Sequence, residues 1–195
     1  MVRLTRWGKF STLGRVNAPN YLTLARIIAI PALVAVMLTG FRGHDLVATA
    51  IFVFASITDW LDGYLARKKG LVTVMGQLLD PMADKLLITS ALICLIQLGR
   101  VPAWAAVVII GRELAVTGFR AIASSKGVNI PASGLGKAKM GIESWAVGAL
   151  VLGPVYFGKF FIVAQVGLWL VMVAAIVSAA EYYVRYGPQV LSKQA

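Results

Sequence analysis

The sequence predicts an all-α polytopic membrane protein with six transmembrane helices and an N-terminal amphipathic helix on the membrane surface. Two features of composition support this fold class, because 59% of the 195 residues are hydrophobic and only 14% are charged. Soluble domains are usually about 45–50% apolar and about 25% charged. The third observation is a series of apolar runs near the length of about 20 residues that a helix needs to cross a bilayer. Helices are expected because a backbone in lipid must satisfy its own hydrogen bonds.

The N-terminal segment, residues 1–16, interleaves basic residues with apolar ones that recur every three positions, close to one helical face. The apolar residues are Leu4, Trp7, Phe10 and Leu13. This pattern favours a juxtamembrane helix that lies on the membrane surface, and the alternative is a frayed basic tail. We expect one domain over residues 1–195, with a six-helix core at 17–187.

Six apolar segments follow, separated by short breaks that contain Gly, Pro or clustered basic residues. We expect the transmembrane helices at 21–40, 46–67, 77–98, 103–123, 137–157 and 160–183. Asn20 can cap the first of these helices, and the pair Gly153-Pro154 predicts that the fifth is kinked or ends early. An aromatic belt at the end of the sixth helix is predicted from three tyrosines. They are Tyr182, Tyr183 and Tyr186.

The basic residues predict the orientation of this bundle in the membrane. The net charge is +11, and in the six-helix layout all but three of the 19 Lys and Arg residues fall on one side. The exceptions are Arg42, Arg100 and Lys159. Because cytoplasmic loops collect Lys and Arg, we expect both termini in the cytoplasm. Topology and anionic lipid headgroups explain the positive charge without nucleic acid as a partner.

The residues that most often bind soft metals are almost absent. Cys94 is the only cysteine and lies in an apolar run, which excludes a disulfide within the chain and a cysteine-based metal site. His44 is the only histidine. We interpret it as a solvated residue in a short loop on the side opposite the cytoplasm.

Four of the eight acidic residues instead fall within one stretch, as Asp59, Asp62, Asp80 and Asp84. The spacings i, i+3 and i, i+4 place each pair on one helical face. A short loop joins the second and third helices, so the pairs meet at the cytoplasmic surface. Four carboxylates there repel one another and are costly to desolvate, unless divalent cations bind them. Oxygen ligands suit Mg²⁺, Mn²⁺ or Ca²⁺.

Four carboxylates suit two metal ions about 3.5–4 Å apart, as in phosphoryl-transfer sites. The small residues Gly63, Ala66 and Gly76 would let a backbone or a substrate approach closely. Arg67 follows directly and could hold a phosphate. The alternative, that the aspartates are helix caps and solvated surface charges, does not account for their shared-face spacing on adjacent helices.

These positions carry a resemblance to a known family. The pattern Asp59-x2-Asp62-Gly63-x2-Ala66-Arg67-x8-Gly76-x3-Asp80-x3-Asp84 is similar to the signature of the CDP-alcohol phosphotransferase family at all eight fixed positions. The resemblance implies an integral membrane enzyme, generally a homodimer, in which the hydroxyl of an alcohol displaces CMP from a CDP-linked lipid. It also implies two bound Mg²⁺ or Mn²⁺ ions.

The resemblance further assigns roles to single residues. The implied metal ligands are Asp59, Asp62, Asp80 and Asp84, with Asp80 and Asp84 catalytic and Asp84 also the general base. The implied CDP-lipid pocket comprises Asn20, Thr23, Gly63, Ala66, Arg67 and Gly76.

Two further segments resemble the bacterial branch of the family that uses CDP-diacylglycerol and glycerol 3-phosphate. They are Asn17-Ala18-Pro19-Asn20-Tyr21-Leu22-Thr23-x2-Arg26 and Arg112-Glu113-x3-Thr117-Gly118-x-Arg120. The acceptor phosphate needs cations, and the candidates are Arg112, Arg120, Lys137 and Lys139, whose alternative explanation is ordinary cytoplasmic-side charge. Glu113 could pair with an arginine. The resemblance places the enzyme in the bacterial cytoplasmic membrane, with its active site facing the cytoplasm.

Other functions remain open at this stage. Within the family the acceptor could be inositol phosphate or serine, and one segment departs from the branch. Where that branch reads Gly-Lys-x-Lys-Thr-x2-Gln, this chain carries Met140 and Glu143 in place of the hydroxyl and the amide. A cation-coupled transporter is the alternative from another class, and it predicts acids near the bilayer midplane. Glu181 is interpreted as a pairing or interface residue.

Overall fold

The computed structural model describes residues 18–69, 74–127 and 134–192, and every regular element in these ranges is helical. Side chains are described for residues 24–58, 82–127 and 140–188. The elements are α1 (Ala18–Thr39), α2 (His44–Lys69), α3 (Val74–Gln97), α4 (Ala103–Ser125), α5 (Gly134–Phe157), the 3₁₀ turn η1 (Gly158–Phe160) and α6 (Phe161–Ser192). The all-α prediction is confirmed, and the surface helix predicted for residues 1–16 lies outside the described residues.

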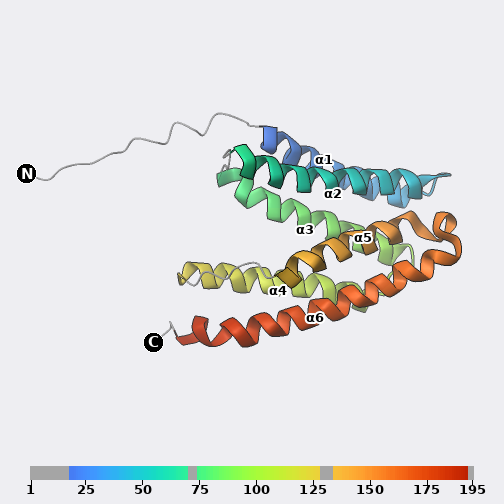
Figure 1. Ribbon diagram of the computed structural model, residues 1–195. Coiled ribbons are helices and arrows are strands. Elements are labelled where there is room, and N and C mark those ends of the chain that lie inside the picture. Colours follow the sequence, from blue (N-terminus) through green and yellow to red (C-terminus); the bar gives the residue numbers. More distant parts are fainter. Residues whose placement is uncertain (1–17, 70–73, 128–133, 193–195) are drawn as a thin grey trace, which may run out of the picture.

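Successive helices run in opposite directions, so that the bundle has two distinct ends (Figure 1). One end, which we call the aspartate end, gathers the starts of α1, α3 and α5 and the ends of α2, α4 and α6. Helix α1 packs against α2 and α3, α5 packs against α6 and α2, and α4 packs against α6 and α3. Short connections produce this antiparallel order because they leave no length for a helix to cross back.

The predicted segments match the helices to within a few residues at most ends. The exception is α6, which continues to Ser192 although its predicted end was residue 183. Its last turns extend alongside α4, where Tyr182 and Tyr186 pack on a small cluster around Val116 and Ala123. Packing on a neighbouring helix stabilises these more polar turns, which hydropathy alone does not identify as helical.

The packing between helices depends on many small residues. A Cβ atom added at Gly167 of α6 would lie 3.2 Å from the Cβ atom of Ala146 in α5, so the two backbones approach closely there. Large aliphatic side chains such as Leu33, Leu92 and Leu150 fill the space between the helices. Close approach through small residues is typical of helices that associate in lipid.

Judged by length and composition, fewer of the described helices could cross a membrane than the six predicted. Among the described residues, one helical stretch, Met140–Pro188, is long and apolar enough to span a membrane. The apolar portions of α1 and α2 with described side chains, Leu24–Thr39 and His44–Thr58, are shorter. Six transmembrane helices therefore stay a prediction.

The kink predicted in α5 is confirmed at Gly153, which has φ 75° and ψ 173° inside the helix. Pro154 has no N–H group, so the carbonyl of Leu150 loses its usual partner four residues on. The Arg100 guanidinium replaces the missing donors, at 3.2 Å from the Leu150 oxygen and 2.8 Å from the Val151 oxygen. Its other nitrogen binds both carboxylate oxygens of Asp45 at 2.8 Å. This Arg100 clamp joins α2, α5 and the turn after α3.

Two side-chain predictions are wrong. His44 is not a solvated loop residue, because it begins α2 with Nδ1 2.9 Å from the Phe41 carbonyl and Nε2 3.2 Å from Asp45. Tyr182 does not lie in an aromatic belt, because it is buried beside Val116 between α4 and α6. His44 starts a helix and is bonded to its neighbours along the chain, whereas Tyr182 is covered by the neighbouring helix α4.

Candidate active site

The four aspartates occupy corresponding positions on two helices that meet at the aspartate end. Asp59 and Asp62 belong to α2, and Asp80 and Asp84 belong to α3. All four lie within about three helical turns of residues 70–73, which connect the two helices. The predicted helical spacing of each pair is therefore confirmed.

This donor set fits the implied metal ions by its chemistry. It offers carboxylate oxygens only, which Mg²⁺ and Mn²⁺ prefer over sulfur ligands, and both pairs lie near one end of the bundle (Figure 1). The side chains of Asp59, Asp62 and Asp80 lie outside the described residues. Within the described part, no group of three or more His, Cys, Asp or Glu side chains could hold a metal ion. The ligand set consequently stays a prediction.

Asp84 is the one signature aspartate with a described side chain, and it is half-buried. The next residue, Lys85, reaches from α3 to α4, where its ammonium donates a hydrogen bond to the Thr117 hydroxyl. That hydroxyl in turn donates to the Glu113 carbonyl at 2.7 Å. The segment that carries the predicted general base is thus joined to α4 by a charged side chain.

Helix α4 brings two of the predicted acceptor-binding residues to this region. Arg112 donates to Glu113 at 2.6 Å and to the Ser178 hydroxyl of α6 at 2.5 Å, so the predicted pairing of Glu113 with an arginine is confirmed. Arg120 lies two turns further along α4 and is exposed. Helix α4 runs toward the aspartate end, so Arg120 lies nearer to that end than Arg112 does.

The structure also gives a position to Arg26, which the sequence placed in the first of the two segments that resemble the bacterial branch. Arg26 of α1 is only 1% exposed, and its Nε atom donates to the Ala55 carbonyl of α2 at 3.3 Å. The Thr58 hydroxyl donates to the same carbonyl at 2.7 Å. Ala55 lies one turn before Asp59, so Arg26 holds the turn of α2 that leads into the acidic pairs. An arginine inside an apolar run was the signal available from sequence.

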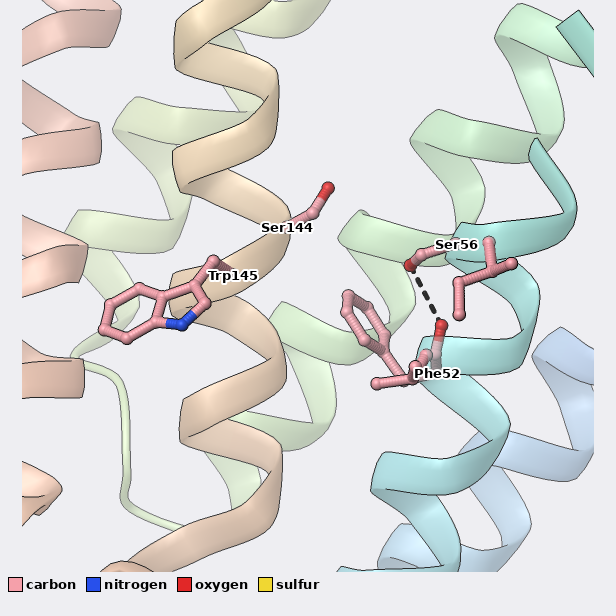
Figure 2. A pocket seen from close by; sticks show the side chains of 6 residues that line it. Phe52, Ser56, Ser144 and Trp145 are labelled. Atoms are coloured by element: carbon pink, nitrogen blue, oxygen red, sulfur yellow. Dashed lines mark hydrogen bonds between the residues drawn. The ribbon is translucent and has the colours of Figure 1, made fainter. Parts of the chain in front are cut away.

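An apolar groove of about 270 Å³ lies between α2 and α5. Its lining residues are Phe52, Val53, Ser56, Ile57, Ser144 and Trp145. In Figure 2 Ser144 points from α5 toward α2, and the Ser56 hydroxyl is bonded to the Phe52 carbonyl of its own helix at 2.9 Å. Apart from these two serines, apolar side chains line the groove.

The residues that line the groove share helical faces with candidate site residues. Ser56 lies three residues before Asp59 on α2, and Ser144 lies seven residues after Lys137 on α5. These spacings place each pair near one helical face. The groove therefore lies on the same faces of α2 and α5 as Asp59 and Lys137, further from the aspartate end.

Comparison with known proteins identifies the family. The family model described as CDP-alcohol phosphatidyltransferase matches residues 16–179, which is most of the chain. This protein belongs to that family. The match includes all eight signature positions, so the resemblance inferred from those residues is confirmed.

Several bacterial relatives cover most of this CDP-alcohol phosphatidyltransferase. One from Bacillus subtilis (strain 168), named CDP-diacylglycerol–glycerol-3-phosphate 3-phosphatidyltransferase, is 43% identical over an alignment 180 residues long that covers 86% of this chain and 93% of the relative. One of the same name from Rickettsia bellii is 37% identical over 86% of this chain and 93% of the relative. A probable phosphatidylglycerophosphate synthase from Mycobacterium tuberculosis is 39% identical over 87% of this chain and 81% of the relative.

The remaining predicted site residues of this CDP-alcohol phosphatidyltransferase are helical, and their side chains lie outside the described ones. Asn20 and Thr23 lie in α1, and Gly76 lies in the first turn of α3. Gly63, Ala66 and Arg67 lie in α2, and Lys137 and Lys139 lie in the first turns of α5. Each of these positions belongs to the end of its helix at the aspartate end of the bundle (Figure 1).

The two departures in α5 differ in where they lie. Met140, which stands where the branch pattern has a threonine, is 51% exposed and lies outside the packed interior. Glu143 is 5% exposed and lies inside the bundle. Of the two departures in this CDP-alcohol phosphatidyltransferase, only Glu143 alters the interior.

Proposed function

We propose that this protein transfers a phosphatidyl group from CDP-diacylglycerol to glycerol 3-phosphate, which gives phosphatidylglycerol phosphate and CMP. The observation that carries the proposal is the set of relatives from three bacterial genera. Their names specify this donor and acceptor or the corresponding synthase, and each alignment covers more than four fifths of both chains. Inositol phosphate, serine and a transporter function receive no comparable support.

In the proposed reaction Asp84 removes the proton from the acceptor hydroxyl. The oxygen then forms a bond to the phosphorus that carries diacylglycerol, while the bond from that phosphorus to the oxygen of CMP breaks. Asp84 must lie within hydrogen-bond reach of the hydroxyl to act in this way. The next residue, Lys85, contacts α4, which carries Arg112 and Arg120, so proton removal and phosphate binding would occur in one region.

Asp59, Asp62 and Asp80, together with Asp84, would hold two Mg²⁺ or Mn²⁺ ions. Such ions supply polarisation of the pyrophosphate and stabilisation of the charge on the departing CMP. The four carboxylates in return become stable near the membrane, because each is neutralised by a cation. Arg26 supports this arrangement through the backbone of the α2 turn that precedes Asp59.

The two substrates would occupy different sides of the acidic pairs. The CDP-lipid pocket would use Asn20, Thr23, Gly63, Ala66, Arg67 and Gly76. The groove between α2 and α5 would accept an acyl chain of the donor, because its lining is largely apolar and lies on the helical faces that carry Asp59 and Lys137. The acceptor phosphate would meet cations of α4 and α5, namely Arg112, Arg120, Lys137 and Lys139.

We further propose six transmembrane helices with both termini and the aspartate end in the cytoplasm of a bacterial cell. The single helical domain would act as a homodimer among membrane lipids. The alternating direction of the six helices supports this topology, since it places both ends of the described chain on one side (Figure 1). The positions of Arg42 and Lys159 at the opposite end agree with the smaller basic content expected there.

A direct assay tests the proposed function. Purified protein in detergent micelles is incubated with CDP-diacylglycerol, Mg²⁺ or Mn²⁺ and a panel of alcohols, and CMP release is measured. We expect release with glycerol 3-phosphate, loss of release in a chelator, and recovery when the metal is restored. Release with inositol phosphate or serine but not with glycerol 3-phosphate would contradict the acceptor assignment.

The variants Asp80→Asn and Asp84→Asn test the chemistry. Each keeps the shape of the side chain and removes its charge, so we expect at least about a hundredfold loss of kcat, the usual scale for one acid–base group. Lys159→Met, an exposed change at the other end, is the control that should keep wild-type activity. Undiminished turnover in either aspartate variant would contradict the proposed mechanism.

A further inference from the structure

Lys85 occupies a position that its role as a cytoplasmic-side charge does not explain. It follows Asp84 on α3, is half-buried, and donates to the Thr117 hydroxyl of α4. An ammonium group placed between helices in an apolar bundle is costly unless polar or charged partners surround it. A neutral polar side chain could make the same contact at a lower desolvation cost. We therefore expect the charge of Lys85 to have a function.

The charges around the Lys85 ammonium are of both signs. It lies within electrostatic range of the carboxylates of Glu113 and Asp84 and of the guanidinium groups of Arg120 and Arg112. One carboxylate, Glu113, is already bonded to Arg112 at 2.6 Å. Among the side chains that the structure describes, three cations including Lys85 itself thus lie near two carboxylates, a local balance that suits an anion.

The hydrogen-bonding capacity of Lys85 agrees with this reading of the charge. A lysine ammonium carries three N–H donors, and the Thr117 hydroxyl accepts one of them. Thr117 is itself oriented, because it donates its proton to the Glu113 carbonyl. The Lys85 amine is therefore held in place by one bond and retains donors for a ligand.

We propose that Lys85 binds the phosphate group of the acceptor alcohol, with Arg120 beside it and Thr117 as the positioning residue. This inference rests on the proposed function and identifies a substrate-binding residue outside the signature and the branch motifs. Because Lys85 is the direct neighbour of Asp84, a phosphate held by its ammonium brings the other end of a short acceptor to the predicted base. Arg112 chiefly supports the site through Glu113 and Ser178.

Kinetics with Lys85→Met tests this role in the full-length protein. The variant removes the charge and keeps much of the apolar length of the side chain. We expect the KM for glycerol 3-phosphate to rise by about tenfold to a hundredfold, the scale of a lost hydrogen bond to a charged group. The KM for CDP-diacylglycerol and the metal concentration for half-maximal activity should stay within about twofold, because those sites do not use Lys85.

Inorganic phosphate provides a readout that does not depend on turnover. It should compete with glycerol 3-phosphate and raise the unfolding temperature of the wild-type protein, and Lys85→Met should weaken both effects. Lys85→Arg keeps the charge and should retain most of the affinity for phosphate. Thr117→Val should raise the acceptor KM about threefold, because the Lys85 ammonium loses the hydroxyl that positions it. Lys159→Met, which removes the same charge from the far end, should change none of these values.

The outcomes separate this inference from the proposed function. If the wild-type protein uses another phosphorylated alcohol, the acceptor assignment fails, and the same KM ratio measured with that alcohol still decides the role of Lys85. Use of an unphosphorylated acceptor such as serine overturns the inference, as does an unchanged acceptor KM in Lys85→Met. If Lys85→Met does not fold, Thr117→Val decides, and an unaltered KM in that variant overturns the role assigned to Lys85.

Discussion

Single charged residues in this protein differ in what they are bonded to, and this difference separates structural from functional cations. The side chain of Arg112 is 11% exposed, and its two Nη atoms are bonded within the chain, to Glu113 and to the Ser178 hydroxyl. Lys85 has a hydroxyl as its bonded partner, and charges of both signs lie around it. A paired guanidinium chiefly stabilises the bundle, whereas the ammonium retains capacity for a ligand.

The Arg112–Glu113 pair leads to a prediction at this scale. Glu113→Met leaves the mostly buried Arg112 charge without its carboxylate, so we expect unfolding in detergent to become easier by roughly 1–3 kcal/mol. The double variant Arg112→Met/Glu113→Met removes both charges and should recover most of that stability, as apolar replacements of ion pairs often do. The Tm in thermal unfolding is the measurement.

Activity of the same double variant separates the two possible roles of Arg112. If Arg112 binds the acceptor phosphate, the stable double variant should still have a raised KM for glycerol 3-phosphate. Recovery of both stability and KM would show that Arg112 serves the fold alone. Equal instability of the single and double variants would contradict the pairing account.

At the scale of elements, the break in α5 is stabilised by a residue from another part of the bundle. Gly153 and Pro154 end the regular hydrogen bonding of α5, and the Arg100 clamp supplies donors to the carbonyls that this break exposes. Asp45 completes the clamp from the first turn of α2. The clamp lies at the end opposite the aspartates, so it sets how α5 approaches α2 without touching the candidate site.

The clamp predicts a pattern of stability unlike that of the Arg112–Glu113 pair. Asp45→Asn and Arg100→Met should each lower stability by about 3–5 kcal/mol, the scale of a broken buried ion pair. The double variant should recover only part of the stability lost in Arg100→Met, because the α5 carbonyls still lack donors. Thermal unfolding of the four proteins tests this, and Arg42→Met, an exposed change at the same end, should behave like wild type.

Gly153 supplies an independent check of the clamp. Its backbone lies in a region that is essentially restricted to glycine, with a cost of about 1–3 kcal/mol for other residues. An added Cβ atom would also lie 2.6 Å from the Arg100 Nη1 atom. Gly153→Ala should therefore lower the Tm, and a Tm equal to that of wild type would contradict the geometry given for the kink.

For the whole molecule, the alternation of helix direction and the distribution of basic residues both indicate two chemically distinct ends. The candidate site lies at the basic end, where anionic nucleotide and phosphate groups gain from the positive field. The apolar groove between α2 and α5 leads away from that end. A lipid substrate with a charged headgroup and apolar tails matches this division.

Topology gives the prediction at this scale. Cys94 is buried and is the only cysteine, so a Cys94→Ala background allows single cysteines to be introduced at exposed positions. In intact cells an impermeant maleimide should label Lys159→Cys, whereas Arg185→Cys should react only after permeabilisation. Labelling of both positions from outside, or of neither, would contradict the proposed arrangement with both termini in the cytoplasm.

The sequence by itself determined the helical segments, the break at Gly153, the spacing of the four aspartates and the family. These features depend on local periodicity, on proline and glycine chemistry, and on residues at fixed separations along one helix. A hydrophobic run or an i, i+4 pair has the same meaning wherever the helix lies. For this reason the helix bounds agreed with expectation except where tertiary packing extended α6.

Only the tertiary structure decided which polar groups meet. Arg100 binds Asp45 across 55 positions, Arg112 binds Ser178 across 66, and Lys85 binds Thr117 across 32. Such partners depend on which helices pack together and on their rotation, which no local pattern specifies. The physical reason is that a charge in an apolar bundle must find a partner, and the packing of the helices determines which partners are within reach.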